Sequence, residues 1–294
     1  KAEGKYPVVI KADGLALGKG VLICQNEQEA ADGVKEIMLD KKFGASGNHV
    51  VVEEFLTGPE VSVLSFCDGK TVKPMVSSMD HKRALDHDEG LNTGGMGTVA
   101  PNPYYTSAVA ERCMQEIFLP TVAAMQAEGC PFKGCLYFGL MLTPDGPKVI
   151  EYNCRFGDPE TQVVLPLLES DLLTVMEATT NGTLDKTDVK FSDGAAACVI
   201  LASGGYPLAY EKGKEITGLT AGQLDAADVT VYHAGTAIKD GKLVTNGGRV
   251  LGVTATANTL PEALKKAYAA TESIHFDKLH KRSDIGARAL AAMQ

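Results

Sequence analysis

The sequence has no apolar run near the length that a membrane-spanning helix requires, which is roughly 20 consecutive apolar residues. Its first residues, KAEGKYPVVIKADG, also lack the long apolar core of a signal peptide. These absences argue against a membrane partner and predict a protein of the cytoplasm.

The chain is also short of positive charge. Its 28 lysines and arginines stand against 37 aspartates and glutamates, which gives a net charge of -9. A nucleic-acid-binding surface normally carries a stripe of basic side chains. We therefore expect no nucleic-acid partner, although local basic pockets remain open.

The cysteines lack the pairing that a disulfide framework or a zinc site would show. There are 7 of them, an odd number, and none stands in a CxxC pair. Cys130 and Cys135 are close in sequence, but no second Cys or His pair with zinc spacing lies nearby. We expect reduced thiols, most of them buried as small apolar side chains, and no zinc.

What the sequence does contain is enough apolar material for two or three packed units, since 45% of its 294 residues are hydrophobic. Runs rich in β-branched residues predict strands, and residues 107–127 have the spacing of a long helix. Residues 77–103 show little periodicity and predict a long loop, which is usually functional inside a compact domain. We predict a small lobe at 1–57, a larger lobe at 58–188 and a C-terminal domain at 189–294.

A glycine-rich loop, DGLALGKG, separates two predicted strands near the start of the chain. It is not a phosphate-binding P-loop, because only three residues separate Gly14 from Gly18 and because Gly20 replaces the required Ser or Thr. A P-loop also opens a helix, whereas this loop leads into the β-branched run VLIC. The loop could close on a polyphosphate with Lys11 and Lys19 as cations, or it could be a solvated hairpin.

Two further segments place acidic side chains at strand ends. In VVVEEFLTGPEVSV, the acids could be ordinary exposed side chains, or the segment could be a hinge whose backbone meets an adenine ring while Glu60 accepts from ribose hydroxyls. In VIEYNCRFGDPETQ, strand alternation places Glu151 and Asn153 on one face, where their oxygens suit a hard cation such as Mg²⁺. Arg155 could then donate to the same phosphates. The alternative is a polar strand end with acids that cap the helix from Glu160.

Taken in order, the segments DGLALGKG, EEFLTGPE, DHKRALDHDEGLNTGGMG and IEYNCRFGDPETQ resemble those of ATP-grasp ligases. More closely, together with HAGT and GGRVLGVTA, they resemble the phosphoribosylamine-glycine ligase family, also called glycinamide ribonucleotide synthetases. The resemblance implies an α+β ATP-grasp fold, with two α+β lobes around a nucleotide cleft and a C-terminal mixed α/β domain. It also implies ATP-dependent joining of glycine to 5-phosphoribosylamine through a glycyl phosphate, a step of purine biosynthesis.

The resemblance assigns roles to particular residues. The residues that would bind ATP are Lys11, Gly18, Lys19, Gly20, Glu53, Glu54, Phe55, Leu56 and Glu60. The residues that would face glycine and phosphoribosylamine are Asp80, His81, Lys82, Asn92, Thr93, Gly94, Gly95, Met96, Gly97, Arg155 and Asp158. Arg155 and Lys19 would act on the transferred phosphoryl group, and Glu151 and Asn153 would hold Mg²⁺, with Mn²⁺ as an alternative.

Two departures from the family pattern leave other functions open. The strand GCLYFGLML carries no acid, so a metal would rest on few protein ligands. The chain also begins directly at a strand, without the family's N-terminal domain, which we expect to pack on this chain. The alternatives are therefore a different ATP-grasp carboxylate-amine ligase, or an ATP-binding fragment without catalysis.

Overall fold

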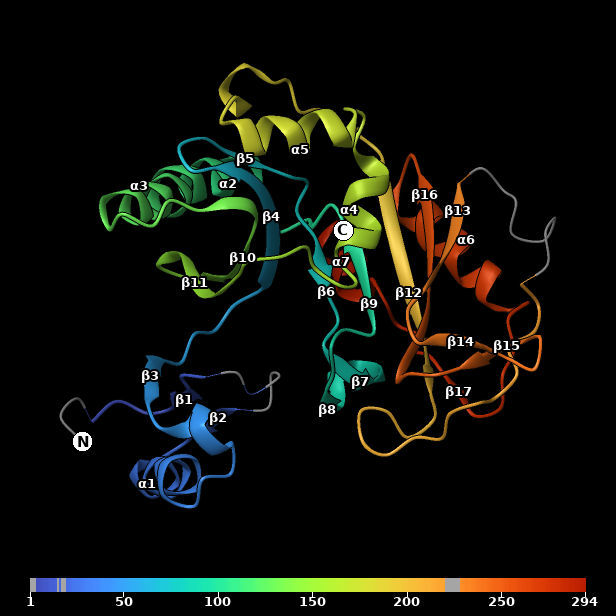
Figure 1. Ribbon diagram of the computed structural model, residues 1–294, viewed down its shortest axis with the longest axis horizontal. Helices are drawn as coiled ribbons and strands as arrows, with labels where there is room; N and C mark the ends of the chain where they lie inside the picture. The colour runs from blue at the N-terminus through green and yellow to red at the C-terminus, as the bar shows by residue number, and fades with distance from the viewer. Residues whose placement is uncertain (1–3, 15, 17–19, 220–227) are drawn as a thin grey trace. The chain divides into compact units, whose positions relative to one another are not determined.

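The computed structural model describes residues 4–14, 16, 20–219 and 228–294, and contacts divide the chain into units 1–57 and 58–294 (Figure 1). The division coincides with the end of the predicted small lobe. Each unit has its own sheets and core, so each is described by itself. No helix in the described part of the chain is long and apolar enough to cross a membrane.

Unit 1 is a three-stranded antiparallel sheet with helices on one face. The strand order is β2-β1-β3, with bounds Val21–Cys24, Val8–Ala12 and Val50–Glu54. Helix α1, Glu27–Val34, runs on into a π-helical turn at Lys35–Leu39, and a 3₁₀ turn follows at Gly44–Gly47. Because strand side chains alternate, Ile10 points to the helices and is buried with Cys24 and Ile37, while Lys11 points to the opposite face.

The first sheet of unit 2 is antiparallel and covered on both faces. Its order is β11-β10-β4-β5, with bounds Gly146–Asn153, Lys133–Thr143, Glu60–Asp68 and Val72–Pro74. One face packs on a continuous helical segment made of α2, a π-helical turn and α3, with bounds Ser107–Cys113, Met114–Phe118 and Leu119–Ala127. The sequence therefore predicted this helix well, and the rings of Phe118 and Phe138 join it to β10 with centroids 4.2 Å apart.

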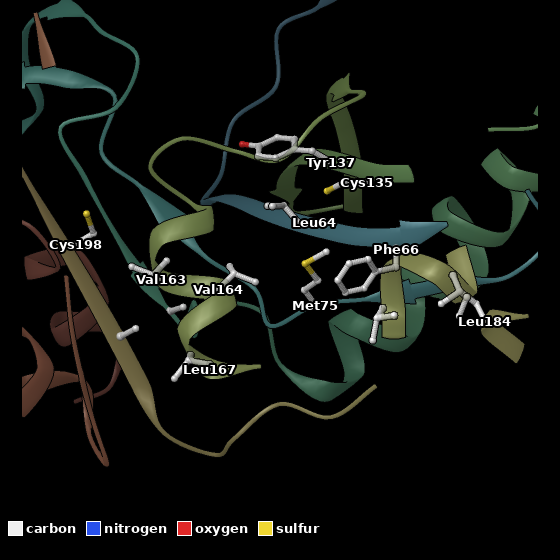
Figure 2. Close-up of a cluster of buried hydrophobic side chains, with 14 of the residues drawn as sticks. Leu64, Phe66, Met75, Cys135, Tyr137, Val163, Val164, Leu167, Leu184 and Cys198 are labelled. Carbon is white, nitrogen blue, oxygen red and sulfur yellow. The ribbon is translucent and has the colours of Figure 1, made fainter. Parts of the chain in front are cut away.

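The other face of this sheet packs on α4 and α5, whose bounds are Thr161–Val164 and Leu172–Asn181. Figure 2 shows Leu64 and Phe66 from β4 and Tyr137 from β10 together with Val163 and Val164 of α4. Short 3₁₀ turns lie at Leu165–Leu167 and Leu184–Lys186. The predicted break between two helices near Pro166 is thus present.

The second sheet of unit 2 has the order β13-β16-β12-β9-β6, and β17 also pairs with β12. The bounds in that order are Val229–His233, Arg249–Ala257, Ala195–Ser203, Gly97–Ala100, Met79–Asp80 and Leu279–His280. Helix α6, Leu260–Thr271, covers one face and α4 packs on the other. Every residue of β12 is buried, as expected for a strand with both faces covered.

The described part of unit 2 also contains smaller elements. They are the hairpin β7-β8, the hairpin β14-β15 and helix α7, with bounds Arg83–Leu85, Glu89–Asn92, Thr236–Lys239, Lys242–Thr245 and Ala287–Ala292. A 3₁₀ turn at Asp86–Asp88 connects β7 to β8.

The prediction that residues 77–103 form a loop was wrong, because this stretch contains β6, β7, β8 and β9. Strands β6 and β9 pair with each other, and β9 also pairs with β12, the central strand of the sheet, which lies about a hundred residues further along the chain. Because these strands depend on a distant partner, the sequence of the segment itself shows little periodicity. The same sheet takes strands from both sides of the division predicted between 188 and 189, which stays a prediction.

The thiols agree with the sequence-based expectation. All seven cysteines are free, and five of them are buried. Cys130 and Cys154 are exposed.

The hairpin β7-β8 is fixed to the C-terminal segment by Arg282, whose side chain is 1% exposed. Its Nε and Nη2 donate to the two carboxylate oxygens of Asp284 at 2.7 and 2.9 Å. Its Nη1 donates to Oδ1 of Asp88 at 3.0 Å and to the carbonyl of Arg83 at 3.1 Å. A buried guanidinium with these partners ties two segments about 200 residues apart.

We expect Arg282→Ala to lower the free energy of unfolding by about 3 to 5 kcal/mol, because it leaves Asp284 without its buried counter-charge and removes the buried one of the two arginines paired with Asp88. Chemical denaturation would measure the change. Arg288→Ala is the matched control, since Arg288 also pairs with Asp88 but is 53% exposed, and we expect a loss below about 1 kcal/mol. Equal effects from the two variants would contradict this account of Arg282.

Candidate active site

One face of the sheet in unit 1 carries exposed apolar side chains together with the ion pair of Lys11 and Glu53. Nζ of Lys11 lies 2.6 Å from Oε2 of Glu53. In the strand pairing, Lys11 lies between Val21 of β2 and Val51 of β3. Ile23 lies two residues beyond Val21 on β2 and on the same face. Val21, Val51 and Ile23 are exposed, so this face can meet a flat apolar ring beside a charged group.

The glycine loop of unit 1 is described in part. Gly18 and Lys19, both predicted to bind phosphate, lie outside the described residues. At Gly20 an added Cβ would lie 2.7 Å from Cβ of Ala16, so the close return of the chain requires glycine there. The other predicted nucleotide contacts of unit 1, Glu54, Phe55 and Leu56, lie at the end of β3 and directly after it.

The predicted metal ligands lie side by side on β11. Nδ2 of Asn153 donates to Oε1 of Glu151 at 3.1 Å, so strand alternation brings the two together as predicted. Gly139 of β10 is the partner of Glu151 in the strand pairing. A Cβ added to Gly139 would lie 3.1 Å from Cγ of Glu151. The glycine leaves room for the carboxylate.

Arg155 extends this group. Its Nη2 donates to Oδ1 of Asn153 at 3.4 Å, and its Nη1 donates to the carbonyl of Phe156 at 2.9 Å. The described residues contain no cluster of three or more His, Cys, Asp or Glu that could hold a metal. A carboxylate and an amide oxygen at an exposed position nevertheless fit Mg²⁺, which keeps water and phosphate oxygens in its shell.

Lys82 lies among carboxylates. Its Nζ forms an ion pair with Oε2 of Glu60 at 2.8 Å, so the predicted ribose acceptor is engaged with a lysine of the predicted substrate motif. Burial disfavours the charged form, but the negative charges of Glu60, Asp80 and Glu151 outweigh burial and raise the pKa of Lys82. Lys82 is therefore a constant cation that can neutralise an anionic ligand.

Asp80 and Glu160 form a pair of carboxyl groups with raised pKa values. Burial, followed by the charge of Glu160, raises the pKa of Asp80 to about 8. Burial also raises the pKa of Glu160, which is 5% exposed. Oε1 of Glu160 accepts from the hydroxyl of Tyr137 at 3.0 Å, and Ser62 Oγ lies 2.7 Å from the same hydroxyl. The pair therefore retains a proton near neutral pH.

His81 is buried, and both of its ring nitrogens form hydrogen bonds with backbone groups. Nδ1 lies 3.1 Å from the carbonyl of Gly97, and the N–H of Gly286 donates to Nε2 at 3.0 Å. Nδ1 therefore carries the proton and donates to Gly97. Burial, followed by the charges of Arg282 and Arg288, lowers the pKa of His81 to about 4. This geometry favours a structural role for the ring, and the predicted contact with substrate stays untested.

The loop Asn92–Gly97 is held in one conformation by its neighbours. The hydroxyl and N–H of Thr93 both donate to the carbonyl of Lys82, at 2.8 and 2.7 Å. Gly95 has φ +113°, and an added Cβ would lie 2.5 Å from Cδ of Pro159. Met96 is fully buried below the loop. Only glycine fits at position 95.

Sequence reasoning missed Arg249, Tyr206 and Glu160 as members of this site. Nη1 of Arg249 donates to the carbonyls of Gly94 and Asp158 at 2.8 and 2.7 Å. The segment GGRVLGVTA contained the signal, since it was noted as part of the resemblance, but its arginine was given no role. The carboxylate of Asp158, predicted to face substrate, is paired with Arg249 Nη2 at 3.0 Å.

Two family models match the chain. Residues 2–161 match the ATP-grasp (A) domain of phosphoribosylglycinamide synthetase, and residues 196–288 match the C domain of the same synthetase.

Similar proteins support the same family. A phosphoribosylamine–glycine ligase of Vibrio vulnificus (strain YJ016) is 48% identical over 289 residues, which are 98% of this chain and 67% of that protein. The trifunctional purine biosynthetic protein adenosine-3 of Gallus gallus is 51% identical over 285 residues, which are 97% of this chain but 28% of that protein. The crystal structure of a phosphoribosylamine–glycine ligase from Thermotoga maritima matches with a TM-score of 0.86 and 40% identity, covering 97% of this chain and 70% of that one.

We expect His81→Gln to reduce the acid sensitivity of folding. The pKa of His81 lies near 4 in the folded state and near 6.5 when unfolded, so protonation favours unfolding as pH falls through this window. From about pH 7.5 to about pH 5, this histidine should cost the wild type about 2 kcal/mol of unfolding free energy that the variant retains. Asp80 acts in the opposite direction, so the comparison uses the difference between the two proteins at each pH. An identical pH slope in chemical denaturation would contradict a neutral, buried His81.

We expect Gly95→Ala to lower the free energy of unfolding by about 1 to 3 kcal/mol more than Gly129→Ala, because only the first forces atoms into Pro159. Gly129 is the control, since it also has a positive φ, +76°, but open space around its Cα. Thermal or urea denaturation of both variants measures the difference. Equal losses would mean that backbone conformation alone requires Gly95.

Proposed function

The chain belongs to the phosphoribosylglycinamide synthetase family, and on this basis we propose that it ligates glycine to 5-phosphoribosylamine at the expense of ATP. The products would be glycinamide ribonucleotide, ADP and phosphate, in purine biosynthesis. The proposal is supported by the names of its relatives and by site chemistry in both units. One observation carries most of the weight, namely the contiguous arrangement of Glu151, Asn153 and Arg155 at the end of β11.

Nucleotide binding would draw on unit 1. The exposed apolar face around Val21, Val51 and Ile23 suits an adenine ring, and Lys11 supplies a cation beside it. The backbone that follows β3, at Phe55 and Leu56, would offer hydrogen bonds to the edge of the ring. The resemblance assigns Gly18, Lys19 and Gly20 to the phosphates, and the first two lie outside the described residues.

Mg²⁺ would be held by Glu151 and Asn153, and when bound it would neutralise the phosphate oxygens of the nucleotide. Arg155 donates to the oxygen of Asn153, and from this position its guanidinium would contact the transferred phosphoryl group. Lys82 adds a cation whose charge is constant over the working pH range.

The chemistry needs positioning and charge neutralisation more than a covalent nucleophile. A carboxylate is a poor electrophile, so the γ-phosphoryl group first moves to the glycine carboxylate and gives glycyl phosphate and ADP. The amine of phosphoribosylamine then attacks the carbonyl carbon, phosphate leaves with the electrons of the broken C–O bond, and the amine loses a proton. The leaving phosphate can carry this proton away, since Asp80, with a pKa of about 8, is itself mostly protonated near neutral pH.

The assay that tests the proposal measures ADP release with ATP, Mg²⁺, glycine and phosphoribosylamine, alongside calorimetry of ATP binding. We expect ADP release to need both substrates. Release with glycine and some other amine would assign a different ligase, and ATP binding without turnover would assign a nucleotide-binding module.

We expect Glu151→Gln and Asn153→Ala to weaken Mg²⁺-dependent ATP use by about 10-fold or more, since the first removes the negative charge of the carboxylate ligand and the second removes the amide oxygen. Their melting temperatures should stay close to wild type, because neither side chain is part of a core. Glu177→Gln, at an exposed position on α5, is the control and should leave both properties unchanged. If the two site variants lost folding stability and ATP use together, the polar end of β11 would be a capping feature and not a metal site.

A further inference from the structure

Arg249 joins two loops that carry predicted substrate residues. Its Nη1 bridges the carbonyls of Gly94 and Asp158, at 2.8 and 2.7 Å, and its Nη2 pairs with Oδ2 of Asp158 at 3.0 Å. The other oxygen of Asp158 accepts from Nε2 of Gln162 at 2.7 Å. Gly94 and Asp158 are 64 residues apart in the sequence. The guanidinium of Arg249 therefore connects two loops that are not neighbours along the chain.

The strand that carries Arg249 is shaped to present it. Arg249 is the first residue of β16, and it pairs with Ala202 across a register shift in the β12-β16 ladder. Such a bulge changes the direction of side chains on the bulged strand. The side chain of Arg249 is 20% exposed, whereas that of Asp158 is 49% exposed.

The fit at Gly94 is close. An added Cβ there would lie 3.0 Å from Cζ and Nη2 of Arg249, so the guanidinium lies directly against the glycine. The N–H of Gly94 donates to the hydroxyl of Tyr206 at 2.9 Å, and Tyr206 packs on Gly248, next to Arg249. Both backbone groups of Gly94 are therefore held by residues that follow β12.

We propose that Arg249 is a positioning residue that sets the separation of the loops Asn92–Gly97 and Arg155–Asp158 and thereby controls the binding of glycine or phosphoribosylamine. The inference rests on the proposed function. A planar fork with several donors is needed to reach acceptors on two loops at once, and a lysine ammonium cannot reproduce that arrangement. Nucleotide contacts on unit 1 should be independent of Arg249.

Three variants test the proposal. Arg249→Ala removes the bridge, Arg249→Lys keeps the charge but not the fork, and Tyr206→Phe removes only the second contact to Gly94. Arg112→Ala, an exposed arginine of α2 paired with Glu116, is the control for loss of a surface guanidinium.

For Arg249→Ala we expect KM for glycine or phosphoribosylamine to rise between about 10- and 100-fold, with the Kd for ATP within about 2-fold of wild type. Arg249→Lys should stay close to Arg249→Ala, and added guanidinium ion should restore part of the activity of Arg249→Ala only. Unchanged KM values would overturn the proposal. So would equal weakening of ATP and substrate binding together with a lowered melting temperature, which would indicate a purely structural role.

Hydrogen exchange separates this proposal from the proposed function. In Arg249→Ala, amides of 92–97 and 155–158 should exchange faster while those of β12 do not change. If the wild type releases no ADP with glycine and phosphoribosylamine, the proposed function fails, and faster exchange confined to these two loops still supports the positioning role. Unchanged exchange in both loops would overturn it.

Discussion

The burial of β12 on both faces is the constraint on which unit 2 depends. Along residues 195–200 of this strand, alternate side chains belong to two different hydrophobic cores, one shared with α4 and the other with α6. Because β12 has apolar side chains on both faces, turning either face toward water would expose apolar surface. The strand must therefore lie between two covering layers. With β12 fixed in this way, β9 pairs along one edge and β16 along the other. The loop that precedes β9 and the arginine that begins β16 therefore meet.

Charge balance is the second constraint, and it acts locally. Carboxylates of Glu60, Asp80 and Glu151 surround Lys82, and each stabilises its ammonium form. Burial has the larger effect at Glu160, whose pKa is raised although the charges of Lys82 and Arg155 act in the opposite direction. The site thus combines the constant positive charge of Lys82 with one carboxyl group, Asp80, whose pKa of about 8 lies near neutral pH. Both properties suit a reaction that handles phosphate and then releases a proton from an amine.

The sequence predicted features that depend on local periodicity and missed those that depend on contacts through space. Alternation along β11 was enough to pair Glu151 with Asn153, because both lie on one strand. Glu160 accepts a hydrogen bond from Tyr137, and Arg249 donates one to the carbonyl of Gly94. The residues of each pair are far apart in the sequence, so no rule of sequence spacing predicts these contacts. The strands within 77–103 were missed for the same reason, since β6 and β9 belong to a sheet centred on β12.

The second sheet pairs strands that are far apart in the sequence, and this limits where recombination between related genes can occur. A recombination point between codons 57 and 58 separates no strand from its described neighbours, because β1, β2 and β3 all precede it. A point between codons 188 and 189 would divide β9 from β12 and leave two incomplete sheets with exposed edges. Chimeras between relatives therefore keep both large sheets of unit 2 whole when they inherit residues 58–294 from one parent.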